Sequence, residues 1–390
     1  MKRFIGYTLT YKVMKRRILL LISILSMLVL SATSETMNSG DEVVTCDMDK
    51  TIPTLFDDWI EDISCTVLEK DLFDTYMTII PYKDLYYVMG RTIAGVKIVI
   101  FKDTGEYVKE LQLQDPIATE SMTIIPELEE LWVINFGNII HKYKLDGTFL
   151  KRIKLPFSCT NIITADFPDF LVYSGGGKDE KGSIQQHLFA LTDFQTIHQL
   201  FIPQWGTQSN PYAPFSLYAK DTNTKRIYVF PSKIDTIYCY SYLQKKMKPY
   251  YALNFHGDFL TKDKEPAGPS EDKEMNDIIT QNKYIYTHTS FQLVNNKLVF
   301  KLRGKRDDFY MIDLNSNKAY SFDKLFDQFQ TYSYNPFLGA KDNSLYMIVR
   351  EQDLNKHYQS HTCSYDKIKQ TLKALPATSN KWILLKINLK

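Results

Sequence analysis

Short runs of apolar residues, some continuous and some alternating with polar residues, recur along most of the chain. Examples are "VKIVIF" (96–101), "ELWVI" (130–134) and "KLVFKL" (297–302). Runs of this length that are rich in β-branched and aromatic residues are typical of strands. Turn sequences such as "DTG" (103–105) and "LDG" (145–147) lie between them, and they favour hairpins because Asp and Gly tolerate a left-handed backbone. The pattern predicts an all-β protein.

The pentapeptide "MTIIP" occurs twice, at 77–81 and at 122–126, and the longer units around the two copies also align (76–114 and 121–156). In each unit the pentapeptide precedes three more strand-like runs within about 45 residues, which is the period of a four-stranded propeller blade. One such sheet cannot bury both of its faces, so the units must stack around an axis. We therefore expect "MTIIP" to form the crowded innermost strand of a blade, with its proline at the end of the strand.

The second strand of each unit provides a marker that recurs along the chain. The markers are Leu85, Leu131, Phe170, Ile227, Leu298 and Leu345. The longest interval, between Ile227 and Leu298, contains the charged stretch 256–283. We expect a six-bladed β-propeller of four-stranded antiparallel blades, in which 256–283 forms a long loop with a short helix around 271–280.

Closing a ring of blades requires the two ends of the chain to meet. The chain ends in the strand-like run "WILLKINLK" (382–390), and "DISCTVLEK" (62–70) precedes the first blade. We expect the N-terminal run to supply the outermost strand of the last blade. The ring would then have no long open edge, which is the usual route to unwanted strand pairing.

The first residues of the chain have the pattern of a secretory signal peptide. Basic residues within 12–17 precede a 13-residue apolar run (18–30), and Ala32 and Ser34 provide small side chains before a cleavage site. The apolar run is shorter than the roughly 20 residues that span a bilayer. Met14 alone could start a conventional signal peptide, which leaves open that 1–13 is a mis-called start.

These features divide the chain into a signal peptide (1–34), an N-terminal linker (35–58) and the propeller (59–390). They predict export to the periplasm or cell envelope. The alternative is that the signal stays uncleaved and anchors the protein, and we expect no other contact with the membrane.

The chain has five widely spaced cysteines. They are Cys46, Cys65, Cys159, Cys239 and Cys363. No CxxC or CxxH pair is present, which argues against a structural zinc site. We expect most of them to act as small buried hydrophobic residues, and a Cys46–Cys65 disulfide is left open because an exported protein permits one.

Several segments resemble the exported six-bladed β-propeller proteins common in Bacteroidetes, which are similar in architecture to NHL-repeat propellers. The resemblance lies in "WIEDISCTVLEKD" (59–71), the paired units, "PYYALNFHGDFL" (249–260) and "KWILLKINLK" (381–390), and it covers roughly 55–390. It implies the fold and export, and it implies no particular activity. Many members of the group look like lipoproteins, whereas this chain has no cysteine directly after the apolar run.

Charge and motifs exclude several functions. The formal charge is only +2, from 47 basic and 45 acidic residues, so we expect no binding to nucleic acid or anionic lipid. The Gly-Gly-Gly-Lys stretch within 173–182 lacks the rest of a phosphate-binding loop and is interpreted as a hairpin loop of blade three. His357 and His361 are four residues apart but lack an HExxH motif, and we expect a surface loop there.

Propeller enzymes place functional side chains at the axial mouth, in loops that enter the inner strands. The corresponding candidates are Asp74, Glu120, Asn161, His288 and Asn335. They do not align at one offset, so we predict no ring of metal ligands, no cofactor and no catalytic residue.

The sequence therefore favours an exported, non-catalytic binding or interaction propeller for a glycan, a peptide or an envelope protein. The alternatives are a propeller enzyme, such as a metal-dependent lyase, a lactonase or a glycan-active hydrolase, and a sensor or structural part of an envelope complex.

Overall fold

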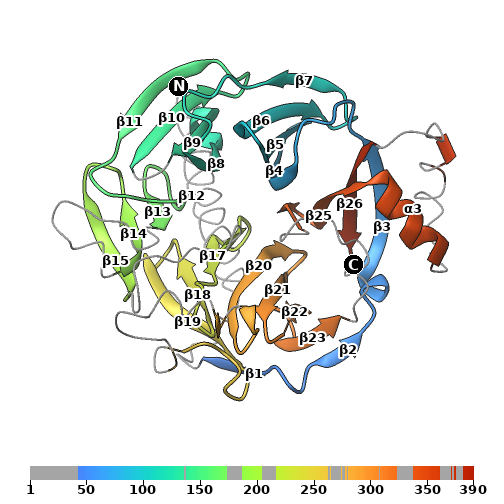
Figure 1. The fold of residues 1–390 in the computed structure, drawn as a ribbon. Helices are drawn as coiled ribbons and strands as arrows, with labels where there is room; N and C mark the ends of the chain where they lie inside the picture. The colour runs from blue at the N-terminus through green and yellow to red at the C-terminus, as the bar shows by residue number, and fades with distance from the viewer. Residues whose placement is uncertain are drawn as a thin grey trace, which may run out of the picture. The chain divides into compact units, whose positions relative to one another are not determined.

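The computed structural model describes residues 43–135, 138–173, 187–203, 217–261, 264, 274, 277–278, 280–306, 308–322, 337–360, 370, 373–374 and 381–390. Within the unit Val44–Lys390, the strands form six sheets arranged around a common centre (Figure 1). The predicted six-bladed β-propeller is confirmed. All six marker residues lie in the second strand of their blade, as expected.

The first three blades are four-stranded and antiparallel. Blade 1 contains β4 (Thr75–Tyr82), β5 (Leu85–Thr92), β6 (Gly95–Lys102) and β7 (Tyr107–Glu110). Blade 2 contains β8 (Thr119–Ile125), β9 (Glu130–Asn135), β10 (Ile139–Lys144) and β11 (Phe149–Lys154). Blade 3 contains β12 (Asn161–Thr164), β13 (Phe170–Tyr173), β14 (His187–Thr192) and β15 (Ile197–Pro203).

The last three blades each include a strand from the N-terminal part of the chain. Blade 4 contains β16 (Tyr218–Asp221), β17 (Arg226–Val229), β18 (Thr236–Ser241), β19 (Lys246–Asn254) and β1 (Val44–Asp47). Blade 5 contains β20 (Ile285–Val294), β21 (Lys297–Gly304), β22 (Phe309–Asp313), β23 (Lys318–Phe322) and β2 (Ile52–Thr54). Blade 6 contains β24 (Gly339–Lys341), β25 (Ser344–Arg350), β26 (Trp382–Leu389) and β3 (Ile60–Val67).

The expected closure of the ring is confirmed, since β3 is the outermost strand of blade 6 and pairs antiparallel with β26. Cys65 lies opposite Leu385, and Ile63 lies opposite Ile387. The backbone N–H of Lys390 also donates to the Trp59 carbonyl at 2.9 Å. The two ends of the propeller therefore share one sheet.

The N-terminal segment contributes two strands that the sequence did not predict. β1 pairs in parallel with β19, and β2 pairs in parallel with β23. The expected linker 35–58 thus contains two strands, and blades 4 and 5 have five strands rather than four. In Figure 1 the blue segment from β1 to β3 follows the outer edges of three successive blades.

The hydrophobic core is divided among the interfaces between blades. Among the described residues, six clusters of buried side chains occupy the six interfaces. Tyr87 of blade 1 and Val133 of blade 2, for example, are fully buried in the same cluster. Because each blade is covered on both faces, its middle strands are apolar on both sides, which explains the continuous apolar runs in the sequence.

Both copies of "MTIIP" form an inner strand, as predicted. The second proline, Pro126, follows the end of β8, but Pro81 lies within β4. The expectation that the proline ends each strand is therefore wrong for the first copy. Gly339 of β24 packs so closely on this strand that a Cβ atom there would lie 2.2 Å from the Ile79 carbonyl oxygen, so only glycine allows this approach.

One segment that was expected to be a loop is a helix in the structure. The segment around His357 was expected to be a loop, but Glu351–Ser360 forms helix α3, whose first turn carries Glu351 and Asp353. Acidic side chains at a helix N-terminus interact favourably with the helix dipole. The loop prediction rested on the polar composition of the segment and did not use this signal. His361, Cys363 and the glycine-rich stretch 174–182 lie outside the described residues.

The described cysteines carry thiols. Cys46 lies in β1 and Cys65 in β3, on different blades, so the disulfide left open by the sequence does not form. Burial raises the pKa of the Cys46 thiol to about 11 and of Cys239 to about 12. The expected short helix is present in part, since Glu274, Asp277, Ile278 and Thr280 have helical backbone.

Candidate functional site

A central channel with a volume of about 880 Å³ runs through the propeller, and residues of the inner strands of all six blades line it. These strands are β4, β8, β12, β16, β20 and β24. A cavity of this size is within the range of small-molecule sites in proteins. The channel is the candidate functional site.

The two mouths of the channel are distinguished by the direction of the inner strands. Because the chain forms four successive antiparallel strands in each of blades 1 to 5, it returns to the end at which it entered the blade before it starts the next one. All six inner strands therefore run in the same direction. We call the end where they begin the N-terminal mouth and the end where they finish the C-terminal mouth.

Glu120 is the carboxylate of the N-terminal mouth. It is the second residue of β8, and the pairing of β8 with β9 shifts register between Thr119 and Ser121, so Glu120 is the extra residue of a β-bulge. Bulges turn a side chain away from the regular alternation of the sheet. Here the bulge places Glu120 in the lining of the channel.

The Glu120 carboxyl is partly removed from water, and one of its oxygens has no described hydrogen-bond partner. Its Oε2 atom is buried and has no hydrogen-bond partner among the described residues. Burial raises the pKa of this carboxyl to about 7, because removal from water disfavours the charged form. An unpartnered buried carboxylate is costly, and such groups in a cavity are typical of functional sites.

Two neighbours on the next blade extend this polar patch. Thr160 and Asn161, at the start of β12, also line the channel. The Thr160 hydroxyl is buried and has no partner within the described part of the chain. The Ser121 hydroxyl donates to the Thr160 carbonyl at 2.5 Å, which joins β8 to the segment leading into β12. Arg91, at the end of β5, is the cation in the lining of this mouth.

Lys220 lies nearer the C-terminal mouth. The Tyr218 hydroxyl lies beside the Thr123 side chain, which puts these two residues of β16 and β8 at a similar depth. Lys220 is two residues beyond Tyr218, half-buried in the lining, and it forms no ion pair with any described residue. Burial lowers its pKa, and the charge of Glu127 partly offsets this shift.

Glu120 and Asn161 are the two sequence-predicted candidates that line the channel. Asp74 is exposed, directly before β4, and lies outside the lining. His288 is fully buried in β20, where its ring stacks on Phe230 with centroids 4.1 Å apart. Burial lowers the pKa of His288 to about 3, so it is a neutral core residue rather than a mouth residue. Asn335 lies outside the described residues.

Sequence reasoning missed Arg91 and Lys220. Arg91 ends a second strand, so no rule about inner-strand entrances could find it. Lys220 belongs to a four-residue inner strand without the "MTIIP" pattern, and the sequence gives no register between β16 and β8.

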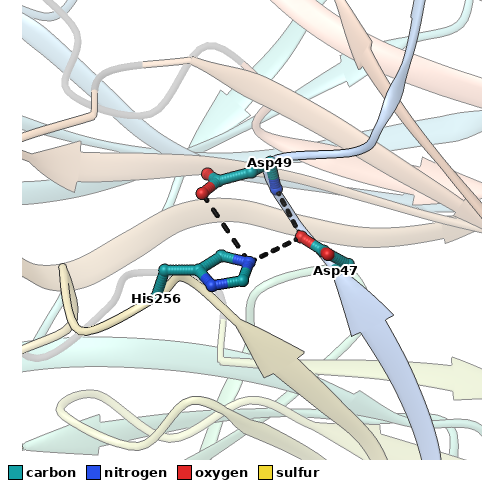
Figure 2. A group of neighbouring side chains, drawn as sticks. All are labelled: Asp47, Asp49 and His256. Carbon is teal, nitrogen blue, oxygen red and sulfur yellow. Dashed lines mark hydrogen bonds and ion pairs between the residues drawn. The ribbon is translucent and has the colours of Figure 1, made fainter.

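A second group of polar side chains lies at the outer edge of blade 4. In Figure 2, the His256 imidazole lies between two carboxylates, with Nε2 at 2.9 Å from Asp47 Oδ1 and 3.7 Å from Asp49 Oδ2. The geometry has the residue types of a metal site. Basic side chains already occupy both carboxylates, however, because Lys50 contacts Asp47 at 2.9 Å and Arg306 contacts Asp49 at 2.5 Å.

This group is better explained as a set of ion pairs that hold β1 against blades 4 and 5. Hydrogen bonds from His256 and Lys50 hold the pKa of Asp47 well below its usual range. Arg306, which follows blade 5's strand β21, also contacts Asp258 at 2.9 Å. The charges therefore link the N-terminal strand to the loops of blades 4 and 5.

Comparison with known families identifies the fold independently. The family model DUF5128, described as "6-bladed beta-propeller", matches residues 32–350. The chain belongs to this family. A search of curated proteins found no match.

Two solved structures from Bacteroides show how widely the family's fold extends. One is a Bacteroides fragilis protein described as exported, with a TM-score of 0.67 and 17% identity, and the match covers 89% of this chain and 99% of that chain. The other is a DUF4221 family member from Bacteroides vulgatus, with a TM-score of 0.51 and 11% identity, covering 85% and 97%. At these identities the likeness concerns the fold alone.

Among the described residues of this family member, no helix is long and apolar enough to cross a bilayer.

Proposed function

We propose that this chain is an exported, non-catalytic binding protein that holds its ligand in the central channel of the propeller. The observation that carries the proposal is the unpartnered Glu120 carboxyl inside a channel of about 880 Å³. A group of this kind is costly in the unbound protein, and a ligand that supplies the missing hydrogen bonds would relieve the cost. Export is supported by the signal-like N-terminus and by the structural similarity to a protein described as exported.

The raised pKa of Glu120 is also the observation that favours an enzyme. A carboxyl with a pKa of about 7 has the acidity of a general acid or base at neutral pH. However, Glu120 is the one carboxylate among the described lining residues, which include no histidine. A glycosidase needs two carboxylates, and a catalytic metal needs about three protein ligands. The described lining therefore supports binding better than catalysis.

Thermal unfolding in the presence of candidate ligands tests the proposal. The panel consists of short peptides and oligosaccharides, and the proteins are the wild type and Thr78→Trp. Thr78 is a half-buried lining residue in the middle of β4, so an indole there would fill the channel. A ligand of the channel is expected to raise the Tm of the wild type, since ligands that bind only the folded state stabilise it. It should leave the Tm of Thr78→Trp unchanged.

Val108→Trp is the matched control. Val108 lies on the outermost strand of the same blade and is 42% exposed, so this indole stays outside the channel. It should respond to ligands like the wild type. Equal stabilisation of Thr78→Trp would place the ligand elsewhere, and a panel without any stabilising member would count against binding of both ligand classes.

A further inference from the structure

We propose that the ligand of the channel is a short apolar peptide with free ends, whose ammonium group binds at Glu120 and whose carboxylate binds at Lys220. The inference deepens the proposed function and rests on it. It uses the positions of two opposite, unpaired charges and the character of the surface between them.

The two charges are separated along the axis of the channel. Glu120 precedes Thr123 by three residues on β8, and Lys220 follows Tyr218 by two on β16. Since the Thr123 and Tyr218 side chains lie beside each other on these parallel-running strands, the two charged residues lie at different depths. At about 3.3 Å per residue, their backbone positions differ by roughly 16 Å along the axis.

Both charges are available to a ligand. Both side chains line the channel and are half-buried. Neither forms an ion pair with a described residue, and in particular they do not pair with each other. A charge that is partly removed from water and has no partner gains strongly from a ligand of opposite charge.

The atoms around Glu120 favour a hydrogen-bond donor. Its Oε2 and the Thr160 Oγ1 are buried acceptors without a donor in the described part of the chain, and the Asn161 side chain lines the same mouth. A primary ammonium group has three N–H donors and no acceptor. It therefore matches a carboxylate beside a hydroxyl and an amide better than a second anion or a purely apolar group would. Arg91 lines the same mouth, but its charge does not offset the burial of Glu120, so it leaves this carboxyl to the ligand.

The wall between the charges is mixed. Aliphatic and thioether side chains, including Met77, Met122 and Leu293, alternate with hydroxyl and amide side chains such as Thr78, Thr164 and Gln292. The apolar part favours apolar side chains, and the hydroxyl and amide groups can bond the backbone of a peptide. Methionine side chains also adapt to ligands of different shape. An extended peptide of three to five residues, at about 3.3 Å each, spans the distance between the charges when the Glu and Lys side chains reach towards it.

Calorimetric titration with one tetrapeptide in four forms tests the proposal. The probe is Ala-Val-Ala-Leu with free ends, with an acetylated N-terminus, with an amidated C-terminus, and with both caps. In the wild type each cap is expected to weaken binding at least tenfold. In Glu120→Gln, acetylation should change the affinity less than about threefold, while amidation still weakens it. In Lys220→Gln, amidation should change the affinity less than about threefold, while acetylation still weakens it.

Lys151→Gln is the matched control, because Lys151 is an exposed lysine on β11, the outermost strand of blade 2, and is not part of the channel lining. This variant should keep the wild-type response to both caps. Each comparison is made between peptides on the same variant, so a difference in folding does not affect it. The proposal is overturned if the peptide does not bind at millimolar concentration, or if the caps act equally on all variants. An oligosaccharide that stabilises the wild type but not Thr78→Trp would overturn the peptide ligand and leave channel binding intact.

Discussion

Leu385→Cys is expected to form a disulfide with Cys65 under oxidising conditions and to raise the free energy of unfolding by up to about 5 kcal/mol over the reduced form of the same variant. The two residues lie directly opposite each other in the antiparallel pairing of β26 with β3, where Cα separations suit a disulfide. The bridge closes a loop of roughly 320 residues, and long loops restrict the unfolded chain most. Denaturant unfolding with and without reductant measures the difference.

The reduced form serves as the internal control, since it already contains the smaller side chain at position 385. A second control is Leu385→Cys combined with Cys65→Ser, which should respond to neither oxidant nor reductant. Failure of the bridge to form in the folded protein would mean that β3 does not close the ring beside β26.

The closure and the blade count could be read from the sequence because they rest on long apolar patterns. The runs 62–70 and 382–390 are each long enough to predict a strand, and a ring requires their ends to meet. β1 and β2 could not be predicted in the same way. They are four and three residues long, too short for any periodicity, and their place is set by parallel pairing with blades far along the chain.

Glu120→Gln is expected to stabilise the folded protein by about 2 kcal/mol at pH 8, after a discount for the solvent that still reaches this half-buried group, and to have little effect at pH 4.5. The folded pKa of Glu120 is about 7, against 4.5 for an ordinary glutamate, and each unit of difference corresponds to about 1.4 kcal/mol. A carboxyl whose folded pKa is raised destabilises the fold when both states are ionised, above pH 7. The penalty disappears as the pH falls from 7 towards 4.5, because the folded protein then holds the proton. Glutamine preserves the shape without the charge.

Denaturant unfolding of the wild type and the variant at both pH values gives the result. His288, whose folded pKa is lowered, makes both proteins less stable below pH 6.5, and its contribution cancels in the difference. Glu127→Gln is the matched control, because Glu127 is an exposed carboxylate in the turn after β8, and it should change stability little at either pH. A loss of stability in Glu120→Gln at pH 8 would show that the carboxylate makes a stabilising contact.

The candidate site was predictable only in part, for a physical reason. Glu120 and Asn161 were found because they lie within the first two residues of inner strands, and this property follows from the repeat. His288 satisfied a similar positional rule but turns into the interface with Phe230. Whether a side chain faces the channel depends on bulges and on the pairing of each strand, which one sequence does not contain.

The number of protons released when the free-ended tetrapeptide binds at pH 6.5 tests the central claim most directly. At this pH most of the Glu120 carboxyl is protonated in the unbound protein, and a bound ammonium group would favour its ionised form. Calorimetry in two buffers of different ionisation enthalpy should therefore show the release of roughly 0.7 proton per peptide from the wild type, and almost none from Glu120→Gln. Proton uptake, or equal release from both proteins, would contradict the claim that Glu120 receives the charged end of the ligand.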